Sequence, residues 1–385
     1  MTAPVVLIVM PLAEQRGGAE LALMQLLQTE SSICWHVAFL EDGPMVGHAR
    51  QAGAGVSIIK EGRVRQPHKF AGTIFAIARL AKRIQARAIL AWMAKAHLYC
   101  GPAAKLAGIP AVWFQHGLPR QIIDSLAVRI PAAGSLACSK FVADEQQKMM
   151  PHIPVRVVHP PTDLAMFNSA ALPSPQQCRQ ELALPPAGPL IGIFGRLQRW
   201  KGFHVLIAAL PAILARYPSA TAAIVGGNWH LEPLYQSQLR EQVNELNIAG
   251  HVTFAGHQQD VPRWMQACDV LVHASDCEPF GMTVVEAMSL GKPVVAGASG
   301  GPTEIITDGV DGLLAPFGDS GALAAAILRY LDDGAFAAAV GNAARRRAEY
   351  FSAARFARNV SDAMRQWMLP LPASKQWEVP DTEVG

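Results

Sequence analysis

Two copies of one local pattern constrain how this chain can fold. In each copy a strand of buried-looking residues leads into a glycine turn and then a helix: Val5–Met10 precedes Gly17 and Gly18, and Leu190–Phe194 precedes the segment 195–202. In doubly wound α/β folds, such a turn lets the backbone approach a phosphate at the helix N-terminus. Neither copy reads Gly-x-Gly-x-x-Gly, so a dinucleotide site is not indicated. The pattern predicts two α/β domains, each built on a parallel sheet.

Length and composition agree with two globular domains. The chain has 385 residues, of which 51% are hydrophobic and 16% are charged, as is typical of folded proteins and not of disordered ones. No apolar run reaches the roughly 18 residues of a spanning helix, and the N-terminus lacks the basic start and cleavage site of a signal peptide. The six scattered cysteines form no Cys-x-x-Cys, so neither a disulfide framework nor a zinc site is expected. We expect a cytoplasmic protein.

Composition also marks the domain boundary. Residues 168–189 are rich in Pro, Ala, Ser and Gln and carry little charge, so they are predicted to be a linker with one short helix. The first domain is then 1–167 and the second is 190–366. A long helix is expected near the C-terminus, over 352–368.

Basic residues are concentrated in the first half. Residues 1–165 hold 17 Lys+Arg against 10 Asp+Glu, a net charge of +7, and the remainder holds 16 against 20, a net charge of −4. Eight of these cations lie between Lys60 and Arg87 against a single acid, Glu61, among apolar residues at helical spacing. Two interpretations stay open: a basic amphipathic helix on an anionic membrane surface, or a packed helix with a solvated basic face.

The most informative segment of the second half begins at Glu278. A loop carrying that carboxylate bends at Pro279 and Gly281, and a helix then starts near Met282 and contains Glu286. The free N–H groups of its first turn form an anion site that is aided by the helix dipole. The two carboxylates, eight residues apart, flank any bound anion. Such a site suits a ligand with hydroxyl groups at both ends and a diphosphate between them, as in a nucleotide-sugar.

Two cations add to this prediction. Arg196 and Lys201 lie in the second strand–glycine–helix unit, where Arg can bind phosphate with two N–H groups and Lys adds a point charge. No Asp-x-Asp occurs in the chain, so the aspartates that commonly hold a metal on a diphosphate are missing. We therefore expect no metal and no other cofactor, with the nucleotide-sugar as a substrate.

The segments Gly-Arg-x-x-x-x-Lys-Gly at 195–202 and Glu-x7-Glu at 278–286, the second followed by Ala-Met-x-x-Gly-x-Pro-Val-Val, resemble the donor site of family 4 retaining glycosyltransferases of the GT-B fold, the glycosyl transferases group 1. The resemblance implies two Rossmann-like doubly wound domains that face each other across a cleft. The first would bind the acceptor and the second the donor, and the segment 367–385 would pack back on the first domain.

The resemblance also implies a role for each matching residue. His116 stands at the carboxyl end of a parallel strand, where such sheets bind ligands. Its near-neutral pKa would let it donate to a sugar hydroxyl or a carbonyl. The implied catalytic residues are His116, Arg196, Lys201 and Glu278. The implied donor-binding residues are Gly17, Gly18, Arg196, Lys201, Gly226, Glu278, Phe280, Gly281, Met282, Thr283 and Glu286. Glu20, His116 and Gly117 would line the acceptor cleft.

The chain departs from the family pattern at one place. The family usually has Pro-Asn-Gly-Val-Asp-x-x-x-Phe where this chain has Pro-Pro-Thr before Asp163 and Phe167. The departure puts in question any substrate contact made by the family's Asn.

The sequence as a whole indicates a metal-independent retaining hexosyltransferase. Its donor would be a UDP- or GDP-sugar, and its acceptor a glycan or lipid-linked molecule in exopolysaccharide, lipopolysaccharide or glycolipid synthesis. Two alternatives stay open: a sugar-nucleotide epimerase or hydrolase of the same fold, and a non-catalytic scaffold that binds nucleotide-sugar. No nucleic-acid partner is indicated, and the basic first half allows a peripheral position on the inner face of the plasma membrane.

Overall fold

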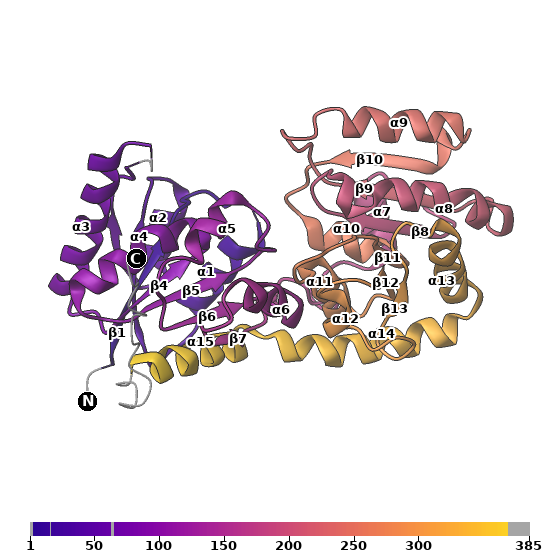
Figure 1. Cartoon of the computed structure of the whole chain (residues 1–385). Helices are drawn as coiled ribbons and strands as arrows, with labels where there is room; N and C mark the ends of the chain where they lie inside the picture. The colour runs from indigo at the N-terminus through magenta and orange to yellow at the C-terminus, as the bar shows by residue number, and fades with distance from the viewer. Residues whose placement is uncertain (1–2, 16, 63–64, 369–385) are drawn as a thin grey trace. The chain divides into compact units, whose positions relative to one another are not determined.

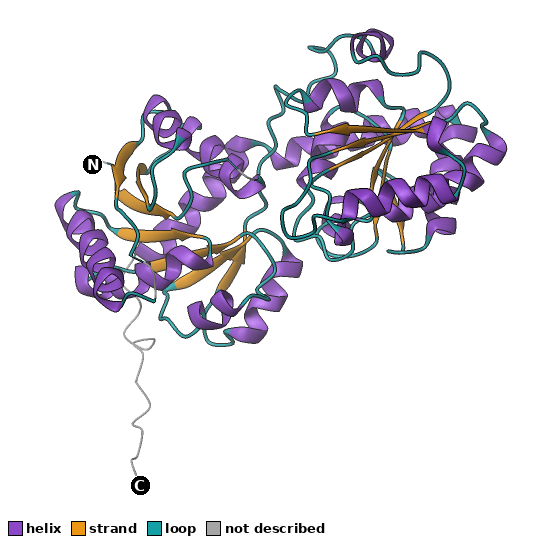
Figure 2. Ribbon diagram, turned by 90° about the horizontal axis from the view of Figure 1, so that it is seen from above, coloured by secondary structure: helices purple, strands orange, loops and turns teal. Residues whose placement is uncertain are grey.

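The computed structural model describes residues 3–15, 17–62 and 65–368, which form two compact units (Figure 1). Among these residues, the first unit contains those from 3 to 137, 143–158 and 357–368. The second unit contains residues 138–142 and 159–356. In both units, helices cover the two faces of a central sheet (Figure 2). No helix of the described part of the chain is long and apolar enough to cross a membrane.

The first unit is built on a seven-stranded parallel sheet in the order β3-β2-β1-β4-β5-β6-β7. Strand β1 (Val5–Met10) pairs on both sides, with Val6 opposite Trp35 of one neighbour and Ala88 of the other. Strands β1 and β4 (Ala88–Trp92) are continuous apolar runs, as expected where helices cover both faces of the sheet. The strands are β1 (Val5–Met10), β2 (Cys34–Phe39), β3 (Gly55–Ile58), β4 (Ala88–Trp92), β5 (Ala111–Gln115), β6 (Gly134–Ala137) and β7 (Val155–Val157). The helices are α1 (Gly18–Gln28), α2 (Pro44–Gln51), α3 (Pro67–Arg83), α4 (Ala94–Ala107), α5 (Ile122–Ala127) and α6 (Lys140–Met149).

The second unit is built on a six-stranded parallel sheet in the order β10-β9-β8-β11-β12-β13. The strand order reverses between β8 and β11, which opens a crevice for ligands at their carboxyl ends. The strands are β8 (Leu190–Phe194), β9 (Thr221–Val225), β10 (Val252–Gly256), β11 (Val270–His273), β12 (Val294–Gly297) and β13 (Leu313–Ala315). The helices are α7 (Pro175–Glu181), α8 (Phe203–Arg216), α9 (Tyr235–Glu245), α10 (Val261–Ala267), α11 (Met282–Ser289), α12 (Pro302–Ile305), α13 (Ser320–Asp332) and α14 (Gly334–Ala348), with 3₁₀ turns at Arg199–Lys201, Ala249–His251 and Glu349–Phe351.

The boundaries between the units differ from those that we predicted at 167 and 190. The predicted linker packs on the second unit, because the buried guanidinium of Arg179 donates to the backbone oxygens of Ala267 and Gly188 and pairs with Asp269 at 2.6 Å. Residues 138–142 also join the second unit. There the hydroxyl of Ser139 donates to the backbone oxygen of Pro279 at 2.5 Å. These are contacts between residues far apart in sequence, which composition does not reveal.

The last helix, α15 (Ala353–Met368), continues from the second unit into the first. Trp367 lies against Gly134 of β6, where a Cβ atom would come within 2.1 Å of the indole ring. The hydroxyls of Ser31 and Ser361 lie 3.2 Å apart in the same unit. The packing of 367–385 on the first domain stays a prediction, because residues 369–385 lie outside the described part of the chain.

Candidate functional site

Glycines bring two loops of the second unit together at the carboxyl ends of β8 and β11. A Cβ atom on Gly202, which has a φ of 74°, would lie 1.9 Å from the backbone oxygen of Ala274. A Cβ atom on Gly226 would lie 1.7 Å from the backbone oxygen of Gly195. Only glycine allows these approaches. The loop after β8, which carries Arg196 and Lys201, is therefore fixed against the end of β11 and the loop after β9.

A buried ion pair occupies this place. The Lys201 ammonium lies 2.5 Å from Oε2 of Glu278, and Nε2 of His273 lies 3.2 Å from the same oxygen. Burial alone would raise the pKa of Glu278, but the charge of Lys201 and the hydrogen bond from His273 hold that pKa well below its usual range. Glu278 is therefore a carboxylate at any physiological pH.

Helix α11 begins directly after this carboxylate. Gly281 has a φ of 109°, a left-handed conformation that glycine adopts readily, and Met282 and Thr283 form the first turn of the helix. The leading N–H groups of a helix have no partner within it, so they and the helix dipole favour an anion at this point. The loop is held from behind, where the N–H of Gly301 donates to the backbone oxygen of Glu278 at 2.8 Å and Phe280 is buried.

The second predicted carboxylate has a different charge state. Glu286 is buried within α11, and burial raises its pKa to about 7, an effect that Lys201 only partly offsets. Near neutral pH it is therefore divided between the acid and the carboxylate. The pKa values of these two glutamates are shifted in opposite directions, because Glu278 has a direct cationic partner and Glu286 does not.

Arg196 is placed differently from Lys201. Its side chain is exposed, and its guanidinium lies 4.5 Å from the ring centroid of Trp229, in the loop after β9. The two loops are joined by a backbone hydrogen bond of 2.9 Å from Leu197 to Gly227. Arg196 is thus held by a cation–π contact at the rim, while Lys201 and Glu278 lie deeper.

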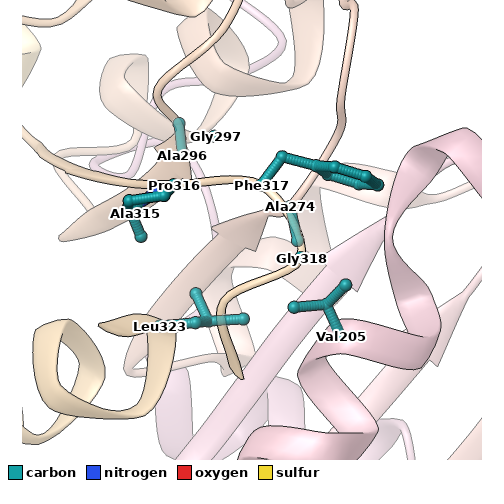
Figure 3. A pocket seen from close by; sticks show the side chains of 9 residues that line it. All are labelled: Val205, Ala274, Ala296, Gly297, Ala315, Pro316, Phe317, Gly318 and Leu323. Carbon is teal, nitrogen blue, oxygen red and sulfur yellow. The ribbon is translucent and has the colours of Figure 1, made fainter. Parts of the chain in front are cut away.

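A small hollow lies at the ends of β11, β12 and β13. It is lined by apolar side chains and glycine backbone, and its lining includes Val205, Phe317 and Leu323 (Figure 3). Its volume of about 10 Å³ is near the limit for one water molecule. We therefore interpret it as a packing gap and not as a ligand site.

The remaining predicted residues lie in the first unit, at the carboxyl ends of β1, β4 and β5. The indole N–H of Trp92 donates to the backbone oxygen of Ala19 at 2.9 Å, and the His116 ring lies 4.9 Å from that of Trp92 and 4.0 Å from that of Phe114. Gly17, Gly18 and the buried Glu20 begin α1 beside Ala19. The structure therefore gathers the α1 start and His116 around Trp92, with Gly117 directly after.

One expectation about His116 is wrong. Burial lowers its pKa to about 3, so the imidazole is neutral at physiological pH instead of titrating there. A neutral ring can still donate one hydrogen bond and accept another.

Sequence reasoning missed His273. It stands at the carboxyl end of β11, just as His116 follows β5, so the rule that singled out His116 would also have found His273. Its contact with Glu278 required the loop geometry.

Residues 176–347 match the family model described as Glycosyl transferases group 1. The lipopolysaccharide core biosynthesis mannosyltransferase LpsB of Rhizobium meliloti is 31% identical over 41% of this chain and 45% of that protein. A D-inositol 3-phosphate glycosyltransferase of Corynebacterium urealyticum is 32% identical over 56% of this chain and 50% of that protein. The chain thus spans about half the length of the curated relatives it matches.

Two solved structures are similar to this chain over 94% of its length. Anabaena Alr3699/HepE in complex with UDP superposes with a TM-score of 0.82 at 26% identity, covering 94% of this chain and 100% of that one. Sucrose-phosphate synthase from Thermosynechococcus elongatus gives 0.78 at 22% identity, covering 94% and 98%. These matches and the two parallel sheets confirm the predicted fold class, GT-B with two Rossmann-like domains.

Proposed function

We propose that this chain, a member of the glycosyl transferases group 1 family through residues 176–347, is a retaining hexosyltransferase that uses a UDP- or GDP-sugar. The observation that carries the proposal is the pairing of Lys201 and Glu278 at 2.5 Å beside the start of α11. A buried cation, a fixed carboxylate and free helix N–H groups together suit a sugar diphosphate. The UDP complex of the similar HepE structure supports a uridine donor, and the LpsB relative supports a role in lipopolysaccharide assembly.

The proposal assigns the donor to the second unit. The diphosphate lies against the first turn of α11 at Met282 and Thr283, with Lys201 and Arg196 supplying positive charge. Glu286 accepts hydrogen bonds from the ribose hydroxyls, and Glu278 accepts from hydroxyls of the transferred sugar. Gly226 lies directly after β9, the strand end where we place the nucleoside. Phe280 and Gly281 fix the loop between the two carboxylates.

The reaction breaks the bond between the anomeric carbon and the diphosphate oxygen. The acceptor hydroxyl attacks the anomeric carbon on the face that the leaving group vacates, and its proton passes to the departing phosphate oxygen. This retains the anomeric configuration, and no carboxylate nucleophile takes part. Lys201, Arg196 and the α11 N–H groups stabilise the charge that develops on the diphosphate, as preorganised donors do elsewhere. We propose that this positive charge makes a metal ion unnecessary.

In the first unit, His116 serves as a hydrogen-bond partner of a sugar hydroxyl. Because burial keeps the ring neutral, we assign it a positioning and polarising role and not the transfer of a proton as an imidazolium. Glu20, Gly17, Gly18 and Gly117 surround the same strand ends and would accommodate the acceptor and the transferred sugar.

The donor assignment is tested by thermal unfolding with UDP, GDP and ADP, each with and without EDTA. We expect one nucleotide to stabilise the protein selectively, with no effect of EDTA, since a ligand that binds only the folded state raises its melting temperature. Arg196→Ala and Glu278→Ala should each lower sugar transfer strongly. Transfer at nearly the parental rate in either variant would contradict the proposal. Free sugar released without any acceptor would indicate a hydrolase instead.

We also propose that α3 rests on an anionic membrane surface. One face of the helix is buried through Ile77, Leu80 and neighbouring residues, and the opposite face is exposed. That exposed face carries Lys69, Phe75, Arg79, Lys82 and Arg83, with the Phe75 side chain 61% exposed. An apolar ring among cations is the pattern of interfacial helices. Such contact would place the protein on the cytoplasmic face of the plasma membrane.

A further inference from the structure

The first unit has a cavity of about 530 Å³ that is separate from the residues gathered around Trp92. It lies where β2 and β3 end, between the turn into α2 and the start of α4. Its lining residues are Leu40, Glu41, Asp42, Ile58, Lys60, Glu61 and Lys95. The volume falls within the roughly 300–1,000 Å³ typical of small-molecule sites.

Hydrogen bonds hold the part of the cavity wall around Glu61 in place. Glu61 is fixed by Lys95 at 2.6 Å and by the hydroxyl of Tyr99 at 3.0 Å. Burial and the Glu61 carboxylate both raise the pKa of Tyr99, so its hydroxyl stays protonated and continues to donate. The N–H of Glu61 also donates to the backbone oxygen of Leu40 at 3.1 Å. The wall therefore exists before any ligand arrives.

The part of the cavity wall around Glu41 is hydrogen-bonded to the loop that leads to Gly17. The N–H of Ala13 donates to Oε1 of Glu41 at 2.9 Å, and the N–H of Met45 donates to the backbone oxygen of Ala13 at 3.0 Å. A Cβ atom on Gly43 would lie 2.7 Å from that same oxygen. Hydrogen bonds thus connect the cavity wall at Glu41 to the segment that precedes α1.

The charges of the cavity indicate what it can bind. Glu61 and Glu41 already accept hydrogen bonds from Lys95 and from the N–H of Ala13. Oδ1 of Asp42 accepts from the N–H of Gly43. The groups left for a ligand are therefore the Lys60 ammonium and Oδ2 of Asp42. The ligand is thus offered one donor group and one acceptor group. Neighbouring hydroxyls on a sugar ring match such a pair, because each hydroxyl both donates and accepts. Three carboxylates against two ammonium groups disfavour a phosphate or a carboxylate ligand.

The apolar part of the lining fits the same ligand. Leu40 and Ile58 contribute side chains to the cavity, and Ile58 is 43% exposed. The C–H face of a pyranose ring can pack on such a surface while its hydroxyls reach Asp42 and Lys60.

We propose that this cavity is an acceptor subsite that holds a neutral hexose unit of the acceptor glycan. That unit lies one or more sugar units away, along the glycan, from the hydroxyl that receives the transferred sugar. The inference rests on the proposed function for its name as an acceptor subsite. Binding of a neutral sugar in the cavity is a separate property and can be measured without any transfer.

The test uses the full chain and ligand-observed saturation-transfer NMR. The probes are the methyl α-glycosides of glucose, mannose and galactose at millimolar concentration, with inorganic phosphate and glucose 6-phosphate as anionic probes. The variants are Asp42→Asn, which keeps an oxygen for the N–H of Gly43, and Lys60→Met, which keeps an apolar stem. Lys105→Ala, on the exposed end of α4 outside the cavity, is the matched control.

We expect at least one neutral glycoside to give a signal with the parent and with Lys105→Ala. We expect the affinity to fall about tenfold in Asp42→Asn and in Lys60→Met, the effect of losing one or two hydrogen bonds. No signal from any neutral glycoside would overturn the proposal, and so would an equal signal in all variants. Binding of phosphate in place of the neutral sugars would also overturn it and would identify an anion site.

Failure of this proposal and failure of the proposed function give different results. Under the proposed function UDP binds the second unit, so a loss of UDP-induced thermal stabilisation would not affect sugar binding in the first. If transfer is measured, the cavity variants should raise the acceptor KM about tenfold while the donor KM and kcat stay unchanged.

Discussion

Lys201→Met provides a direct test of the buried ion pair, because it removes the ammonium and keeps the apolar stem. The side chains of Lys201 and Glu278 are 16% and 11% exposed, so the variant leaves a nearly buried carboxylate with His273 as its remaining partner. Removing one partner of a buried pair costs about 3–5 kcal/mol. Because some exposure and one hydrogen bond persist, we expect about 3 kcal/mol of lost stability at pH 8.

The loss should depend on pH in a defined direction. In the parent, the pKa of Glu278 lies below its reference value of 4.5, so the pair contributes stability above pH 4.5 and loses it as the pH falls. In the variant, burial dominates and raises the pKa of Glu278 above 4.5, so the buried charge becomes more costly as the pH rises. The difference between the two proteins should therefore shrink on going from pH 8 to pH 5, by up to about 1.4 kcal/mol per pH unit below the raised pKa.

Urea unfolding followed by tryptophan fluorescence at pH 5 and pH 8 would measure this difference. The double variant Lys201→Met with Glu278→Gln is the control, since a neutral amide needs no cationic partner and should recover most of the lost stability at pH 8. Equal destabilisation at the two pH values, or no recovery in the double variant, would refute the electrostatic account of this site.

Three further predictions concern other parts of the molecule. UDP affinity should rise from pH 6 to pH 8 as Glu286, with its pKa of about 7, becomes the carboxylate that accepts ribose hydroxyls; calorimetric titration of Glu286→Gln should lose this dependence. Gly226→Ala should lower stability by more than about 2 kcal/mol in urea unfolding, because its Cβ atom would meet the backbone oxygen of Gly195, whereas Gly250→Ala, with open space around it, should not. The double variant Arg79→Glu and Lys82→Glu should sediment less with anionic vesicles at low salt than the parent or Arg50→Glu on α2, and equal sedimentation would count against membrane contact.

Much of the fold is readable from the sequence because strands such as β1, β4 and β8 are continuous apolar runs. Val5–Met10 and Leu190–Phe194 were predicted with the bounds that the structure gives. The bend at Pro279 and Gly281 likewise predicted the start of α11 at Met282. Boundaries were less accurate where polar contacts decide them. The predicted linker 168–189, for example, packs on the second unit because Arg179 pairs with Asp269.

The site was predicted only as far as local spacing reaches. The sequence placed Lys201 and Glu278 in one site, but not in direct contact, and it gave His116 an ordinary pKa because the burial beside Trp92 and Phe114 is tertiary. The cavity at the ends of β2 and β3 was not predicted at all. Its charged residues come from the ends of two strands and from α4, and Lys60 and Glu61 were interpreted as part of a basic helical stretch that in fact begins at Pro67.

The opposite pKa shifts of Glu278 and Glu286 explain how the second half of the chain, with a net charge of −4, can bind a diphosphate. At neutral pH the charge of Glu278 is balanced by Lys201 at 2.5 Å, and Glu286 is only partly ionised. The start of α11 therefore meets an incoming anion with little local negative charge. Once ribose hydroxyls reach Glu286, their hydrogen bonds favour the carboxylate, so nucleotide binding itself should release a fraction of a proton near pH 7. That release follows from the placement of one lysine beside one of two otherwise similar carboxylates, and calorimetry in buffers of different ionisation enthalpy would detect it.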